Sequence, residues 1–189
     1  MGLPVPMWNG RVMSSVRHDV LRRQFDLTWA LFEYHLERLR PEDILWEPPA
    51  TRCWTVRRAP DGSWVPDWAD TEPDPVPVPT IGWLGWHIGW WWDAAVEHAN
   101  GRDPRPRTEV TWSGGPHRVI EWLGELRSAW LVVLEGFTDA DLDAPARFPW
   151  QDDPGRTVAD MVAWVNAELM KNVAEIGQLR LLRAARSGK

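Results

Sequence analysis

Cysteine, tyrosine and long hydrophobic runs are scarce in this chain of 189 residues. The single cysteine, Cys53, excludes a disulfide framework or a zinc site built from several thiolates within one chain. No uninterrupted apolar run approaches the ~18 residues of a membrane-spanning helix. The sequence also lacks a glycine-rich phosphate-binding loop and a Gly-x-Ser-x-Gly nucleophile elbow. We therefore expect a protein of the reducing cytoplasm, without a membrane partner.

Positive charge is in short supply as well. The chain has 27 acidic and 21 basic residues, which gives a net charge of -6. Its one basic cluster consists of Arg180, Arg183 and Arg186. Proteins that bind DNA or RNA usually present a broad basic face to the phosphates. Nucleic acid is therefore not an expected partner.

Tryptophan, by contrast, is abundant. There are 16 tryptophans beside four phenylalanines and one tyrosine. The simplest interpretation is a core filled with large rings. Because tryptophan is rarely buried completely and its N–H group needs a partner, the surplus also suits the wall of a pocket or a buried interface. We expect a homodimer on the second ground.

The spacing of apolar residues predicts an all-α fold, a four-helix bundle. Thr80 and Thr157 are the expected N-caps of the second and fourth helices. A single domain is expected over residues 14–186, after an N-terminal arm (1–13) and before a short tail (187–189). The predicted helices begin at Ser14 or Ser15 and end at Arg40, then cover residues 80–99, 116–136 and 157–186.

A proline-rich and tryptophan-rich loop separates the first two helices. Eight prolines lie between Pro41 and Thr80, a density that forbids a long helix. Within this loop, residues 53–58 and 63–65 flank the turn signature Ala-Pro-Asp-Gly and predict a small β-hairpin. Because a loop of this length in a compact domain is usually functional, we expect it to cover a site.

Three polar residues interrupt the apolar side of the last helix. Glu168, Asn172 and Glu175 are spaced i, i+4 and i+7, so all three point toward the interior, with Lys171 at the edge of that side. An unpaired charge in an interior costs several kcal/mol, against a folding stability of roughly 5 to 15 kcal/mol. These groups must therefore line a cavity, pair with other groups or hold a ligand.

His87 is the histidine that most strongly indicates a site. Its helical neighbours are Trp83, Leu84, Trp90 and Trp91, so it faces rings rather than water. An imidazole with carboxylate oxygens can bind zinc, manganese or nickel. The alternative is a core histidine, with the two carboxylates paired to Lys171, Arg180 or water. His35, at the edge of the first helix's apolar face, either reaches the cavity or is a boundary residue.

At these residues the chain resembles a known family. The segments that carry the resemblance are Leu36-Glu-Arg-Leu39, the stretch Pro41–Pro48, the His87 helix and the closing Glu175–Leu179. Together they resemble the DinB-like superfamily, in its broad DinB/YfiT-type sense, over most of residues 14–186. The resemblance implies a four-helix bundle, often a homodimer, with relatives that bind a divalent metal. Those relatives include thiol-dependent transferases and mycothiol-dependent maleylpyruvate isomerases.

The family's metal ligands are one histidine on the second helix and a His-x-x-x-His or Glu-x-x-x-His pair on the fourth. His87 matches the first ligand. Glu168-x-x-x-Asn172 has the spacing of the pair, with asparagine in place of histidine, while alignment on the following glycine places Lys171 and Glu175 there instead. Neither alignment restores the second histidine. The chain thus resembles a branch that lacks the usual His-x-x-x-His.

These residues leave three functions open. The first is a transferase or isomerase acting on a small molecule, in which a zinc, nickel or manganese ion held by His87, Glu168 and Glu175 activates a thiol or water while Asn172 orients the substrate. The second is a binding protein for a cationic ligand, with Trp83, Trp90 and Trp91 among the pocket walls. The third is a structural dimer with a vestigial site.

Overall fold

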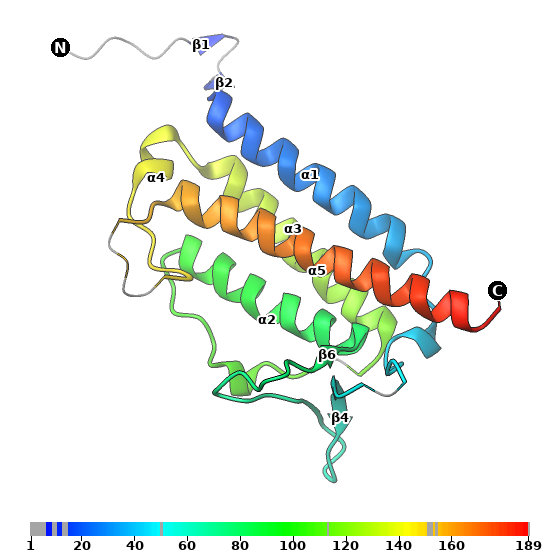
Figure 1. Ribbon diagram of the computed structural model, residues 1–189. Coiled ribbons are helices and arrows are strands. Elements are labelled where there is room, and N and C mark those ends of the chain that lie inside the picture. Colours follow the sequence, from blue (N-terminus) through cyan, green and yellow to red (C-terminus); the bar gives the residue numbers. More distant parts are fainter. Residues whose placement is uncertain are drawn as a thin grey trace.

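The computed structural model describes residues 7–8, 11–12, 15–49, 51–112, 114–150, 153 and 155–188. The chain is mostly helical, with four long helices that lie side by side (Figure 1). Helices α1 and α5 run in one direction and α2 and α3 in the other. None of the helices in the described ranges is long and apolar enough to cross a membrane. The long helices are α1 (Val16–Leu36), α2 (Ile81–Ala99), α3 (Pro116–Gly136) and α5 (Val158–Arg186).

Short helices and strands fill the connections. The expected hairpin is confirmed as β4 (Val56–Arg58) paired antiparallel with β5 (Trp64–Pro66). A second pairing was not predicted: β3 (Cys53–Trp54) lies parallel to β6 (Val78–Pro79), which closes the loop at its base. The remaining elements are η1 (Pro41–Asp43), η2 (Arg107–Glu109), α4 (Asp139–Asp143) and the antiparallel pair β1 (Met7–Trp8) and β2 (Arg11–Val12). Apart from β1 and β2, the expected N-terminal arm lies outside the described residues, as does Lys189.

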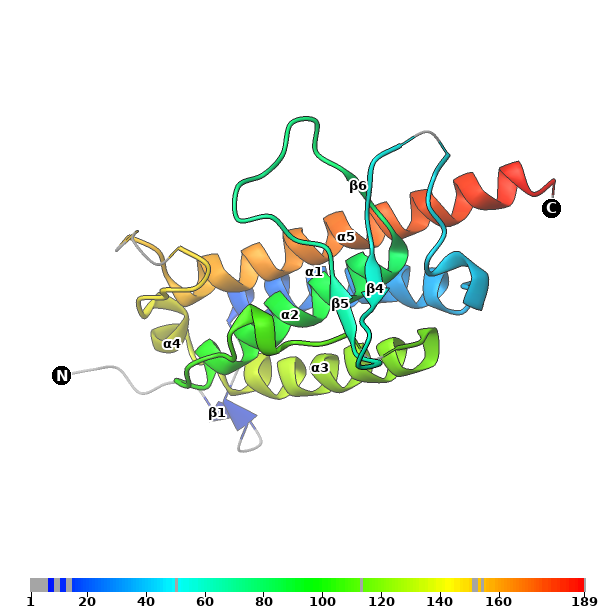
Figure 2. The same cartoon turned by 90° about the horizontal axis from the view of Figure 1, so that it is seen from below.

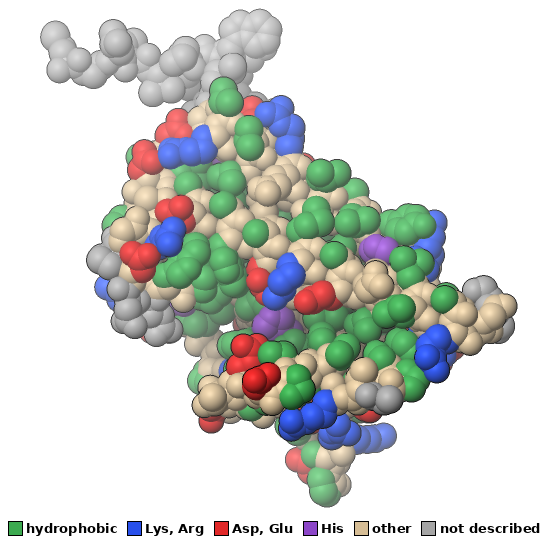
Figure 3. All heavy atoms as spheres, in the orientation of Figure 1, with side chains coloured by type: hydrophobic (Ala, Val, Ile, Leu, Met, Phe, Trp, Pro, Cys, Tyr) green, Lys and Arg blue, Asp and Glu red, His purple; other side chains and the backbone are tan. Residues whose placement is uncertain are grey.

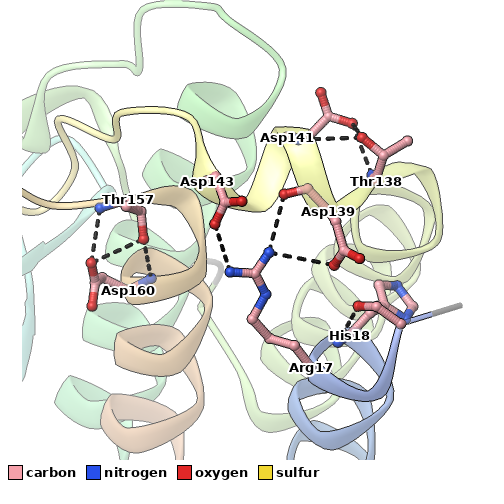
Figure 4. Close-up of polar contacts among 9 residues, drawn as sticks. Arg17, His18, Thr138, Asp139, Asp141, Asp143, Thr157 and Asp160 are labelled. Carbon is pink, nitrogen blue, oxygen red and sulfur yellow. Dashed lines mark hydrogen bonds and ion pairs between the residues drawn. The ribbon is translucent and has the colours of Figure 1, made fainter. Parts of the chain in front are cut away.

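Threonine caps start the helices where the sequence predicts them. Thr80 accepts the backbone N–H of Trp83 at the start of α2. Thr157 and Asp160 form a capping box at the start of α5, and Thr138 and Asp141 form another at α4 (Figure 4). Each cap satisfies backbone N–H groups that a helix leaves unpaired at its start, a contribution of about 1 kcal/mol. These local bonds explain why the helix starts were predictable.

The first helix is shorter than expected. It ends at Leu36 rather than Arg40, with Glu37 as its C-cap. Arg40 has φ -105° and ψ 152°, the extended conformation that a following proline favours. Pro41 then begins η1 instead of merely ending α1. The predicted boundary was therefore wrong by one turn, because the influence of Pro41 extends backward along the chain.

A glycine-bearing face lets α2 approach its neighbours closely. The backbone N–H of Gly82 donates to the carbonyl of Ile44 over 2.7 Å. A Cβ at Gly85 would lie 2.8 Å from the Val119 side chain of α3, and one at Gly89 would overlap the Trp122 ring. Trp92 follows on the same side of the helix, at i+7 from Gly85, and is fully buried, as is Trp86. The glycines thus let α2 approach its neighbours while large rings fill the space beside them.

This close approach yields a stability prediction. Gly89→Ala should lower the free energy of unfolding by about 1–3 kcal/mol, since the added methyl must displace the Trp122 ring. The matched control is Gly124→Ala in α3, where an added Cβ meets nothing within 4 Å. That change should stabilise the protein by up to about 1 kcal/mol through helix propensity. Urea unfolding measures both, and equal effects of the two substitutions would contradict the packing account.

Candidate functional site

A cavity of about 400 Å³ lies between α2, α5 and the excursion, which we define as residues 53–80. Helix α2 contributes Trp83 and His87 to its lining, and α5 contributes Lys171, Asn172 and Glu175. The excursion loops out beside the two helices (Figure 2). In the space-filling view, acidic, basic and histidine side chains gather where the excursion meets α5 (Figure 3).

Tryptophan rings attach the excursion to α2. The indole N–H of Trp83 donates to the backbone carbonyl of Asp67 over 2.7 Å. Trp68, Trp54, Trp83 and His87 form a continuous series of stacked rings, with successive centroid distances of 6.4, 5.1 and 4.8 Å. Such pairs contribute about 0.5–1.5 kcal/mol each beyond the area they bury. The imidazole of His87 is therefore held at the inner end of an aromatic stack.

Two further tryptophans of α2 pack against this stack. Trp86 and Trp90 stack on each other with centroids 5.7 Å apart, and Trp68 meets both of them edge-on. The N–H of Trp86 donates to the carbonyl of Val110 over 2.7 Å, which fixes the loop between α2 and α3. Trp90 thus lies behind the cavity wall and does not line the cavity itself.

Glu168 lies beside two residues that line the cavity. Its Oε1 atom is 2.6 Å from Nζ of Lys171 and 3.6 Å from Nε2 of His87. Burial opposes the ionisation of Glu168, but the hydrogen bonds and positive charges of His87 and Lys171 outweigh it and lower the pKa of this carboxyl. Glu168 is therefore ionised at neutral pH. The structure realises the pairing with Lys171 that the sequence left open as an alternative.

Asn172 connects the core to Glu175. The N–H of Trp91 donates to Oδ1 of Asn172 over 3.2 Å, and Nδ2 of Asn172 donates to Oε2 of Glu175 over 3.0 Å. Asn172 is buried, so both ends of its amide are held. This chain of bonds fixes the orientation of the Glu175 carboxylate at the cavity wall. Trp91 is buried behind it and acts through Asn172.

His35 lies apart from the cavity. It is buried near the end of α1, where its Nε2 atom packs against α5 at a distance of 2.5 Å from where a Cβ of Gly177 would be. Burial, and then the positive charges of Arg180 and Arg38, lower the pKa of His35. The ring is therefore neutral at pH 7. Gly177 is the glycine on which the second alignment of the last helix was based. Because it has no side chain, it makes room for this ring.

The cavity residues do not fit a divalent metal as they are arranged. Lys171 places an ammonium group on Glu168, where a metal would have to bind, and Asn172 donates to one oxygen of Glu175. Within the described part of the chain, no three His, Cys, Asp or Glu side chains gather in a way that could hold a metal ion. A metal would have to displace Lys171 first. We therefore derive no chemical step through a metal.

Several cavity residues were not predicted from the sequence. Trp54, Trp68, Asp70 and Glu72 of the excursion line the cavity, although the loop was expected only to cover a site. The sequence feature that could have indicated them is the occurrence of tryptophan and acidic residues together in the proline-rich stretch. Lys171, by contrast, was expected among the pocket residues, at the edge of the inward side of the last helix, and it lines the cavity.

Comparison with known proteins gives one family. The model of the DinB superfamily matches residues 24–176, which include α2, α3 and most of α1 and α5. No curated protein matches the chain significantly.

The ion pair at Glu168 gives a pH-dependent prediction. Lys171→Met should raise the pKa of Glu168 toward its usual 4.5, because one of the two groups that favour the carboxylate is lost. A depressed carboxyl pKa adds stability above the unfolded value that is lost as the pH falls through the folded value. The variant should therefore be less stable than the wild type at pH 7 and should approach it at an acid pH below the folded-state pKa of Glu168. Lys171 is half exposed, so we expect a difference of about 1 kcal/mol or less.

Carbon-13 NMR titration of the glutamate side chains measures the pKa, and urea unfolding at the two pH values measures the stability. Lys171→Arg keeps the charge and is the matched control. An unchanged Glu168 titration in Lys171→Met would show that the pair is not formed in solution.

Proposed function

This chain belongs to the DinB superfamily. We propose that it is a binding protein for a small-molecule ligand, an organic cation that occupies the cavity. The observation that carries the proposal is the composition of the cavity wall. Three tryptophan rings and three carboxylates, those of Asp70, Glu72 and Glu175, surround a space of about 400 Å³. This volume lies within the ~300–1,000 Å³ range of small-molecule pockets.

The charge of the wall favours a cation. Lys171 is the only Lys or Arg among the lining residues described, and both its ammonium and the imidazole of His87, which also lines the cavity, lie next to Glu168. Asp70 and Glu72 are exposed at the rim, while Glu175 is oriented by Asn172 deeper in the wall. A positively charged guest would therefore be attracted at the entrance and met by a fixed carboxylate inside.

The tryptophans supply the second attraction. Trp68 is the most exposed of the described tryptophans, at 37%. A quaternary ammonium group over an indole face gains roughly 0.5–2 kcal/mol. Trp54 stacks between Trp68 and Trp83, and Trp83 stacks between Trp54 and His87, so these two rings give the guest an apolar wall and not a free face. The guanidinium of Arg107 lies over the Trp68 ring, 4.3 Å from its centroid, and a guest cation on that face would take its place. We propose that the guest sits between these rings and Glu175.

We also propose that the four long helices form the four-helix bundle expected of this superfamily. Helix α1 packs against α5, and α2 packs against both α3 and α5. In this arrangement the cavity lies on the outer side of the α2–α5 contact, under the excursion.

A matched pair of ligands tests the cation proposal. Choline should raise the melting temperature and quench tryptophan emission, whereas its neutral isostere 3,3-dimethylbutan-1-ol should do neither. A ligand that binds only the folded state stabilises it by about 2.7 kcal/mol at a hundredfold excess over Kd. Glu175→Gln should abolish the response, because it removes the carboxylate while keeping the hydrogen-bonding shape.

Glu125→Gln, on the exposed side of α3, is the control and should leave the response intact. An equal response to the neutral isostere would show that apolar contact alone drives binding. No response to either compound would contradict the cation proposal. It would favour a structural role, in which the polar residues of α5 only form hydrogen bonds and ion pairs with one another.

A metal-dependent transferase or isomerase is the second candidate. The observation that favours it is that His87 of α2 and Glu168 of α5 come within 3.6 Å of each other from separate helices. It requires Lys171 to leave Glu168 and zinc, nickel or manganese to take its place. Elemental analysis of untagged protein tests this: a stoichiometric ion that is lost in His87→Ala would favour this candidate over the first.

Self-association is a further proposal. The described tryptophans mostly pack within the chain, so they no longer argue for an interface. The outward face of α1 supports an interface instead, because its side chains Val16, Val20 and Leu27 are 79%, 53% and 67% exposed. We expect light scattering to give the mass of a dimer at micromolar concentration, and Leu27→Glu to give a monomer. A wild-type monomer would contradict the proposal.

A further inference from the structure

Four arginines surround a small hollow at the end of the molecule where α1 and α5 both end (Figure 1). The hollow has a volume of about 160 Å³ and is separate from the cavity described above. Its charged lining residues are Arg38, Arg40, Glu42, Asp43, Arg180 and Arg183. Four guanidinium groups face two carboxylates, so the lining has an excess of positive charge in a protein that is acidic overall.

Nearby acidic residues compensate two of the four arginines, Arg183 and Arg38. Asp43 is fully engaged: Oδ1 pairs with Arg183, and Oδ2 accepts the backbone N–H of Arg40 over 2.7 Å. Glu42 is exposed and makes no ion pair with a described residue. Arg38 pairs with Glu37 over 3.3 Å, donates to the Tyr34 carbonyl over 2.8 Å and lies over the Tyr34 ring.

Arg40 and Arg180 are the unsatisfied members. The side chain of neither one has a hydrogen bond or ion pair with any residue that the structure describes, and Nε of Arg180 is buried without a partner. A buried donor left unpaired is destabilising, and more so when it is charged. The two guanidiniums therefore form an incomplete site that an acceptor anion would complete.

Interaction with the helix ends does not account for these two residues. Positive side chains in the last turn of a helix interact favourably with its free carbonyls. Arg183 and Arg186 occupy the last turn of α5 and fit this explanation. Arg180 lies one turn earlier, and Arg40 lies beyond the end of α1, next to η1.

We propose that this hollow binds a compact oxyanion, the phosphate group of inorganic phosphate or of a small phosphorylated molecule, through Arg40 and Arg180. The planar guanidinium presents paired donors that match phosphate oxygens. The volume is smaller than the ~300–1,000 Å³ of pockets that enclose whole drug-sized ligands. The hollow therefore accommodates the anionic group and leaves any larger part of the molecule outside.

Calorimetric titration of inorganic phosphate into the full-length protein tests the proposal, with chloride added to keep the ionic strength constant. We expect saturable binding at one site, weakened about tenfold or more by Arg40→Gln and by Arg180→Gln. Arg23→Gln changes an exposed arginine of α1 about three to four turns before the end of that helix; it is the matched control and should bind as the wild type does. Arg40 is exposed, so its variant should fold even if the Arg180 variant does not.

His35 provides a second readout. Because Arg180 and Arg38 help to lower its pKa, an anion bound among the arginines should raise the pKa of His35 in an NMR titration. A purely structural arginine cluster would leave it unchanged when phosphate replaces chloride.

Phenyl phosphate distinguishes the two sources of the anion. Tighter binding than inorganic phosphate indicates the phosphate end of a larger molecule, and weaker binding indicates the free ion. The proposal is overturned if phosphate does not bind, or if Arg23→Gln weakens binding as much as Arg40→Gln does, since the effect would then be one of overall charge.

Discussion

The attachment of the excursion to α2 by tryptophan rings is the contact on which the candidate site depends. The excursion has little regular structure of its own, because its prolines allow only two-residue and three-residue strands. The stack from Trp68 through Trp54 to Trp83, and the bond from Trp83 to the Asp67 carbonyl, hold it against the helices. Without these contacts the cavity would lose one wall and most of its acidic residues. The surplus of tryptophan thus serves to attach loops as much as to fill the core.

The inward-facing carboxylates of α5 are paired with other side chains of the same helix. Glu168 is paired with Lys171 three residues later, and Glu175 accepts from Asn172 three residues earlier. Both pairs use the spacing at which helical side chains meet. His87 and Trp91 of α2 add one partner to each pair. The carboxylates of α5 are thus partnered without a ligand, whereas Nδ1 of His87 is buried without a partner, and Glu175 remains at the cavity wall.

Helix α5 has opposite electrostatic surroundings along its length. Near its middle it borders a cavity whose charged lining residues are mostly acidic, and at its end it borders a hollow whose charged lining residues are mostly basic. The two proposed sites therefore differ in the sign of the ligand they attract, and each can be tested without disturbing the other. His35 lies close to the basic end, where Gly177 makes room for it, and not at the acidic cavity.

The sequence by itself determined the features that depend on nearby residues. Thr80 and Thr157 marked the starts of α2 and α5, the Ala-Pro-Asp-Gly turn marked the hairpin, and the apolar spacing marked the long helices. These features rest on bonds within a few residues, which a pattern can reveal. The inward placement of Glu168, Asn172 and Glu175 followed from the same periodicity.

Only the tertiary structure decided what those inward groups meet. Lys171 lies at the edge of the inward side of α5, where a side chain can point either to solvent or to the interior, and periodicity cannot distinguish the two. In the structure it pairs with Glu168. The parallel pairing of β3 with β6, the close approach of Trp122 to Gly89 and the gathering of Arg40 with Arg180 all join residues that are distant in sequence. No local propensity encodes such contacts, since they arise when separate elements pack together and each side chain takes the space that its neighbours leave.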